Sequence, residues 1–161
     1  MKRTFKFITA LLLSSSIICT IIPHEIIHAQ TITISKEIVS DNLYCITEIC
    51  ETPNSEINLF SSSQTKSGSK TQRYVNGNGT TLWYVTVHAT FTYNGSSSSC
   101  TTASVTAESN SSAWKVTNKS SWKSGNTGYA SATATHTLSG SEITSSNRTV
   151  SISCSKTGTL Q

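Results

Sequence analysis

The alternation of residue types between Trp83 and Tyr93 constrains the fold more than any other feature of this sequence. Every second residue of this stretch is apolar, and the residues between them are mostly threonine. A period of two is typical of a strand that buries one face and exposes the other. The stretch is followed by Asn94-Gly95, a dipeptide typical of hairpin turns. We therefore expect an antiparallel β structure.

Further stretches with β-type patterns follow at roughly ten-residue spacing, separated by turn signals. The stretch at 129–138 is rich in alanine, which implies that a bulky strand packs closely against it. We expect an all-β fold, a small antiparallel β-sandwich over residues 74–161. Its strands would be 83–93, 100–107, 113–118, 129–138 and 147–154, with a turn at 123–128.

The amino-terminal residues 1–29 have the organisation of a secretory signal peptide. Basic residues come first, an apolar run follows over 7–22, and Ala29 provides a small residue for cleavage. The apolar run is short and interrupted for a membrane-spanning helix, which needs about 20 residues. The sequence thus predicts a secreted or cell-surface protein, and Cys19 would be removed with the signal.

Residues 30–73 differ in composition from the rest of the chain. Up to Glu56 acidic residues outnumber Lys36, whereas beyond residue 57 basic residues outnumber Glu108 and Glu142. Residues 61–73 are polar and rich in serine, which favours a flexible linker ending at an accessible Arg73. We expect this whole region to be largely irregular. It would be either a removable pro-region that neutralises a basic domain or an acidic extension without a partner.

Four of the five cysteines remain after signal cleavage. In a small exported chain, an even number of cysteines favours disulfides over metal or redox chemistry. Three pairings are possible. We expect Cys100 to pair with Cys154, and Cys45 with Cys50.

Two resemblances follow from these residues. The spacing of Cys100, Trp114 and Cys154 is similar to that of immunoglobulin domains, which implies a Trp packed on an inter-sheet disulfide. The position two before Cys154 is Ile152, however, where those domains carry a tyrosine. The strings WYVTVHATFTYNG, AWKVTNKSSWKSGN and SISCSKTGTL resemble uncharacterised small secreted proteins of Gram-positive bacteria. This second resemblance implies an exported β-domain and identifies no functional residue.

Catalytic motifs are weak. His24-Glu25-Ile26-Ile27-His28 matches the zinc-protease pattern, but it lies in the predicted signal peptide. Glu108 and Glu142 are the only acidic residues of the predicted domain, and both lie near predicted turns. His88 is expected to face solvent from a strand, and His136 to be partly buried. We therefore expect no enzyme activity, no metal and no cofactor.

The most suggestive cluster is a basic one that contains a tryptophan. Lys115, Lys119 and Lys123, with Trp122 among them, could form a face that holds an anionic polymer while the indole stacks on a sugar. The leading hypothesis is a non-enzymatic binding module for anionic cell-wall polymer, glycan or a membrane surface. Nucleic acid is not expected for an exported chain. The alternative is a secreted antimicrobial or toxin-like protein with residues 30–73 as its pro-region.

Overall fold

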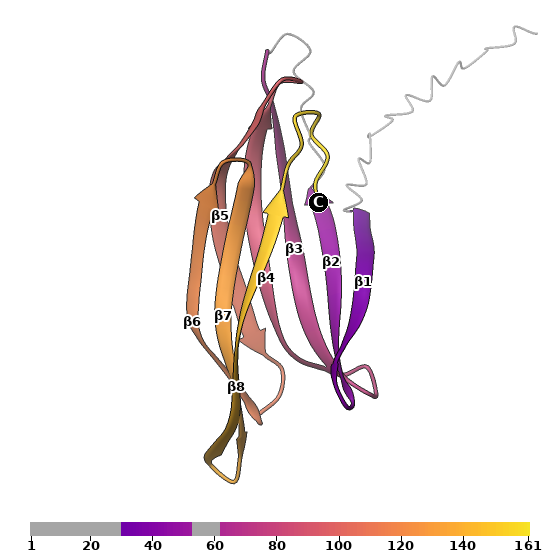
Figure 1. Ribbon diagram of the computed structural model, residues 1–161, viewed down its shortest axis with the longest axis vertical. Coiled ribbons are helices and arrows are strands. Elements are labelled where there is room, and N and C mark those ends of the chain that lie inside the picture. Colours follow the sequence, from indigo (N-terminus) through magenta and orange to yellow (C-terminus); the bar gives the residue numbers. More distant parts are fainter. Residues whose placement is uncertain (1–29, 53–61) are drawn as a thin grey trace, which may run out of the picture.

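The computed structural model describes residues 30–52 and 62–161. Within these residues every regular element is a strand, and the strands form two antiparallel sheets (Figure 1). Sheet A contains β1 to β5 and sheet B contains β6 to β8. The bounds are β1 Gln30–Ser40, β2 Leu43–Thr52, β3 Gln64–Asn76, β4 Thr81–Tyr93, β5 Ser98–Ser109, β6 Trp114–Ser124, β7 Thr127–Leu138 and β8 Ser141–Ser153. The predicted all-β sandwich is confirmed, although it has more strands than the sequence indicated.

The predicted signal peptide and the HExxH string lie outside the described residues. In the two described ranges, no helix has the length and the apolar character needed to cross a membrane.

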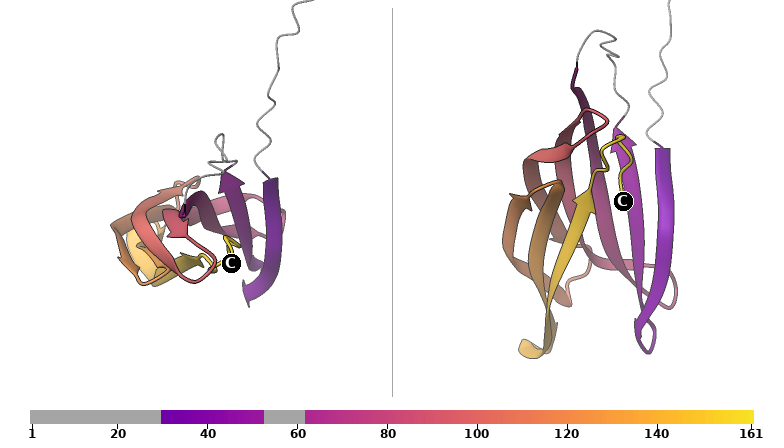
Figure 2. Two further views of the ribbon diagram at one scale, coloured as in Figure 1. Left: turned by 90° about the horizontal axis from the view of Figure 1, so that it is seen from above. Right: turned by 45° about the horizontal axis from the view of Figure 1, so that its top comes forward.

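The connectivity is a simple meander. Neighbours within each sheet are always consecutive in the chain, whereas immunoglobulin sandwiches have Greek-key connections. Sheet B packs on β3, β4 and β5, while β1 and β2 extend to the side (Figure 2). The strand order therefore differs from that of immunoglobulin domains.

The core combines large side chains on β4 of sheet A with small ones on β7 of sheet B. On β4, Trp83, Val85, Val87 and Phe91 are at most 1% exposed, as the alternation predicted. The facing positions of β7 are Gly128, Ala130, Ala132 and Ala134, all buried. The small residues let the sheets approach until the large ones fill the space between them. Each fully buried Val or Phe then contributes about 1.5–3 kcal/mol.

A stack of aromatic rings joins the two sheets at one end of the sandwich. Tyr74 and Trp83 are nearly parallel, with ring centroids 3.9 Å apart. Trp114 of sheet B lies 6.1 Å from Trp83 and 4.8 Å from His136, and the guanidinium of Arg148 lies 5.6 Å from the Tyr74 ring. Trp114 is opposite His136 on β7, while Cys100 and Cys154 lie at the other end of that strand. The expected packing of Trp114 on a disulfide is therefore wrong.

The carboxyl-terminal residues close the opposite end. After β8 the chain turns back, and Leu160 becomes buried against Gly68, where a Cβ atom would lie 2.4 Å from its Cδ1. Gly158 has φ of +87°, and a Cβ atom at this position would lie 2.5 Å from Cζ of the Tyr93 ring, so no side chain fits there. These two glycines permit the return of the chain.

The prediction that residues 61–73 form a flexible linker is wrong, because Gln64–Asn76 is β3, a central strand of sheet A. Its inward positions include Lys66, Gly68, Lys70 and Gln72, as their pairing with the inward residues of β4 shows. Long polar side chains and a glycine therefore occupy positions where alternation would require apolar residues. The polar composition concealed a strand.

The acidic residues 30–52 are also not irregular, since they form β1 and β2. Glu48 pairs with Arg73, and Glu51 with Lys66 at 2.6 Å. The acidic strand β2 and the basic strand β3 are thus neighbours, and their charges partly compensate within one sheet. The charge asymmetry along the sequence reflects this pairing.

Candidate functional site

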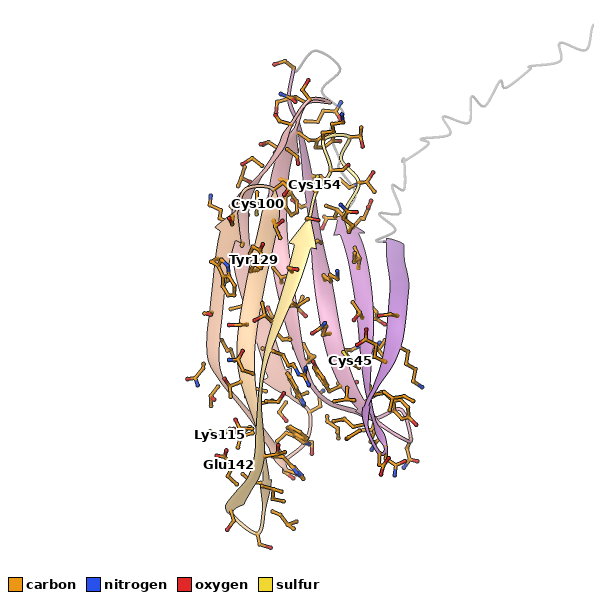
Figure 3. The ribbon with its side chains drawn as sticks, in the orientation of Figure 1. Cys45, Cys100, Lys115, Tyr129, Glu142 and Cys154 are labelled. Atoms are coloured by element: carbon orange, nitrogen blue, oxygen red, sulfur yellow. The ribbon has the colours of Figure 1, made fainter. Side chains whose placement is uncertain are left out.

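The four residues predicted to form one basic face are spread along β6, the edge strand of sheet B. Lys115 and Lys123 are eight residues apart in this strand, which corresponds to roughly 25 Å at about 3.3 Å per residue. Figure 3 shows Lys115 near one end of the sheet, well separated from Tyr129, the neighbour of Trp122 on β7. The screening length at physiological salt is only about 8 Å. These lysines therefore do not act as a single patch.

Lys123 directly follows Trp122 in β6 and so points to the other face of the strand. Lys119 lies in a bulge of β6, where the register shifts between Thr117 and Ser120 and Asn118 has φ of 50°. The Nζ of Lys123 donates a hydrogen bond of 2.5 Å to the carbonyl of Thr101 on β5, and so ties the edges of the two sheets together. Its role in this structure is to join strands.

Trp122 lies on the outer face of sheet B and is 44% exposed. Its ring is parallel to that of Tyr129, the residue opposite it on β7, with an angle of 2° and a centroid distance of 5.1 Å. Since the other exposed large apolar residues of the described chain are aliphatic, this aromatic pair is distinctive. We call it the aromatic platform.

Hydroxyl and amide groups surround the aromatic platform. Ser120 and Ser131 form the next cross-strand pair and share a hydrogen bond of 2.9 Å. Beyond them, the Asn147 side-chain amide donates to Thr133 at 3.2 Å, and Ser151 lies opposite Tyr129 on β8. The outer face of sheet B therefore offers two aromatic rings bordered by neutral polar groups. Neither ring belongs to the hydrophobic core.

The other residues with catalytic potential are not brought together. Glu108 is on β5 of sheet A, next to Tyr84, while Glu142 is on β8 of sheet B. Burial raises the pKa of Tyr84, and the charge of Glu108 adds to this effect. His88 faces solvent and His136 is half-buried, as the sequence predicted. Among the described residues, no three His, Cys, Asp or Glu side chains are placed to hold a metal ion.

The cysteines fall into two situations, and all four thiols are free in this structure. Cys45 and Cys50 are five residues apart on β2, and only Cys45 is buried. A separation of roughly 17 Å along one strand excludes a disulfide, whose Cα atoms lie within about 7 Å. The predicted Cys45–Cys50 pair is therefore wrong.

Cys100 and Cys154, by contrast, come from different sheets and meet at one place. Their backbone amides donate to Gly125 and Asn126, consecutive residues of the β6–β7 turn, at 2.9 and 3.1 Å. Both are at most 4% exposed, and both lie near the same end of the sandwich in Figure 3. Burial raises the pKa of each thiol. The thiols are therefore protonated and well shielded at neutral pH.

Comparisons of this chain with protein-family models, with curated proteins and with solved structures give no match.

Proposed function

We propose that this protein is a non-enzymatic, exported binding module that recognises glycan through the aromatic platform. The exposed, parallel pair of Trp122 and Tyr129 on a flat polar face is the observation that carries the proposal. Aromatic side chains supply large and rigid contact area at a small loss of conformational entropy. A sugar ring can place its C–H groups on such a ring, while its hydroxyls bond to neighbouring serine, threonine and asparagine side chains.

A neutral glycan fits this face better than an anionic polymer. The platform has hydroxyl and amide neighbours, whereas the lysines of β6 are dispersed or engaged elsewhere. Binding that depends on stacking and neutral hydrogen bonds is expected to change little with ionic strength, because only charge interactions are screened. Binding to an anionic polymer would weaken steeply with salt.

The test is a pull-down of the exported protein on insoluble polysaccharides, such as peptidoglycan, chitin, cellulose and xylan, at several salt concentrations. Trp122→Ala should weaken binding about tenfold or more, equivalent to about 1.4 kcal/mol, and Lys119→Ala on the same strand serves as the matched control. If Lys119→Ala and added salt weaken binding while Trp122→Ala does not, the anionic-polymer hypothesis replaces this one.

The pro-region alternative fits the fold poorly. Removal of residues 30–73 would delete β1, β2 and most of β3, along with the buried Cys45 and Ile49. It would also leave β4, the strand with the most residues in the core, without a partner on one side. We therefore place residues 30–73 within the functional unit.

We also propose that residues 1–29 direct export and that Cys100 and Cys154 become a disulfide outside the cell. The two thiols would lose two protons and two electrons to an extracytoplasmic thiol oxidant, and an S–S bond would link the sheets. Closing a loop of this length would stabilise the fold by about 4 kcal/mol in the chain-entropy model. Intact mass should increase by two hydrogens on reduction in the wild type and stay constant in Cys100→Ser. A wild-type mass that reduction leaves unchanged would contradict the bond.

A further inference from the structure

A second face of the molecule has a composition that the aromatic platform does not explain. It is the outer face of sheet A, where the outward positions of β3, β4 and β5 line up in rows through their pairing. From the row Thr71–Thr86–Thr106 to the row Thr65–Thr92–Ser99, these positions carry a hydroxyl except at His88 near the centre. We call this set the hydroxyl grid. It consists of Thr65, Ser67, Ser69, Thr71, Thr86, His88, Thr90, Thr92, Ser99, Thr102, Ser104 and Thr106. The adjoining row consists of Arg73, Tyr84 and Glu108.

The hydroxyl grid itself contains no Lys, Arg, Asp or Glu and no large apolar side chain. The ion pair of Arg73 with Glu48 and the carboxylate of Glu108 border it at one end. Several hydroxyls of the grid bond to one another across strands, Thr71 to Thr86 at 2.8 Å and Ser67 to Thr90 at 3.0 Å. The Nε2 of His88 lies 3.1 Å from Thr106 Oγ1. These bonds hold the side chains of the grid in fixed directions.

Three other hydroxyls near the centre of the grid are left available. Within residues 30–52 and 62–161, no protein group bonds to the hydroxyls of Ser69, Thr102 and Ser104. They line an open hollow of about 200 Å³ together with His88 and Thr90. This is smaller than the about 300–1,000 Å³ of sites for drug-sized ligands. The hollow suits one small polar unit.

The chemistry of the grid selects among ligands. A lipid surface or a hydrophobic protein interface needs apolar contact area, and an anionic polymer needs basic residues. The grid provides neither. It provides closely spaced neutral donors and acceptors together with one imidazole ring, which match a neutral polyhydroxylated chain that places one sugar in the hollow.

We infer that the hydroxyl grid is a second glycan-binding face and that the module is bivalent. This inference rests on the proposed function, which assigns glycan to the aromatic platform. Since the inner faces of the two sheets pack against each other, their outer faces point in opposite directions. One molecule can therefore bind two separate glycan chains and cross-link them.

The test combines variants of the two faces in the full exported protein. Ser104→Leu fills the hollow and removes one hydroxyl at an exposed strand position, and His88→Ala removes the imidazole. Glu108→Gln, outside the hollow on the same strand as Ser104, is the matched control. Thermal unfolding establishes that each variant is folded. The readouts are retention on insoluble polysaccharide and the light scattering of a soluble form of the same polysaccharide.

Wild type should bind and should increase the light scattering. Trp122→Ala and Ser104→Leu should each still bind, about tenfold more weakly, but without cross-linking, and the double variant should not bind at all. His88→Ala should behave as Ser104→Leu does, and Glu108→Gln as wild type. If Trp122→Ala alone abolishes binding while Ser104→Leu has no effect, the inference is overturned and the proposed function stands. If only Ser104→Leu and His88→Ala weaken binding, the grid stands and the platform does not. Absence of binding in wild type overturns both.

Discussion

The facing strands β4 and β7 of the two sheets place side chains of opposite size in the core. Sheet A is wide, with bulky inner residues on β4 and an outer face of small hydroxyl side chains. Sheet B is narrow, with glycine and alanine inside β7 and its large aromatic pair outside. On β4 the large side chains Trp83 and Phe91 therefore face inward, whereas on β7 the large side chain of Tyr129 faces outward. The size of an aromatic side chain therefore does not show whether it belongs to the core or is available to a ligand. The face of the sheet on which the side chain lies does show this.

Exchanging tryptophan for alanine in each sheet tests this contrast most strongly. Trp83→Ala should destabilise the fold by about 3–5 kcal/mol, since Trp83 is 1% exposed and stacks on both Tyr74 and Trp114. Trp122→Ala should change the free energy of unfolding by no more than about 0.5 kcal/mol. Urea unfolding followed by circular dichroism measures both. Equal losses for the two variants would show that the aromatic platform belongs to the core.

The small inner face of sheet B can be tested at Gly128. A Cβ atom there would lie 2.9 Å from Ala89 Cβ and 3.3 Å from Cys100 Sγ. Gly128→Ala should therefore destabilise the fold by about 1–3 kcal/mol. Addition of Ala89→Gly should recover part of the loss, because neighbouring sites couple. The same urea experiment applies, and strict additivity of the two changes would contradict the close approach of the sheets.

The thiols between the sheets predict a pH dependence of smaller size. Burial raises the pKa of Cys100 and Cys154 above the usual 9.0. The unfolded chain then loses these protons before the folded chain does, so stability is complete below about pH 9 and falls as pH rises further. The disulfide-bonded protein should show a shallower fall, because only other groups, such as Cys45 and Tyr74, still contribute. Thermal unfolding between pH 7 and 10.5, with and without reductant, measures this difference. Identical curves would indicate that the two thiols do not pair.

The contact that joins the sheet edges gives the smallest effect. Lys123→Met should destabilise the fold by at most about 1 kcal/mol, since the bond to Thr101 is exposed to water. Lys119→Met, in the bulge, should leave stability unchanged. A larger loss from Lys119→Met than from Lys123→Met would reverse the assignment of these two residues.

The sequence predicted those strands whose inner face is apolar. The alternation in β4 survives in the structure because its inner residues are Trp, Val, Ala and Phe. β3 could not be found in this way, because its inward positions are not apolar. One of them must be Gly68, since Leu160 from a distant part of the chain packs directly against it. In β2 the alternation of Cys45, Thr47 and Ile49 was visible, but the acidic residues between them suggested an irregular segment.

The candidate site was predictable only in part. Trp122 was the residue expected to be exposed, and it is. Its partner Tyr129 was not identified, because the turn was predicted over 123–128, whereas β6 and β7 already pair at Ser124 and Thr127 and only two residues connect them. The hydroxyl grid was missed because its rows form only when β3 pairs with β4. Each of these features depends on strand register.

The meander connectivity has a consequence for how the chain acquires its structure. Within each sheet every strand pairs with the one that precedes it in the chain, so these pairings form between neighbouring segments, and such local contacts favour rapid folding. If the chain is exported amino terminus first, as we propose, sheet A would assemble strand by strand before sheet B emerges. Pulsed hydrogen exchange during refolding would reveal this order as protection of β2 to β4 ahead of β7. Leu160, which packs on Gly68 of β3, lies beyond β8 in the chain, so this contact between distant segments would be among the last to form.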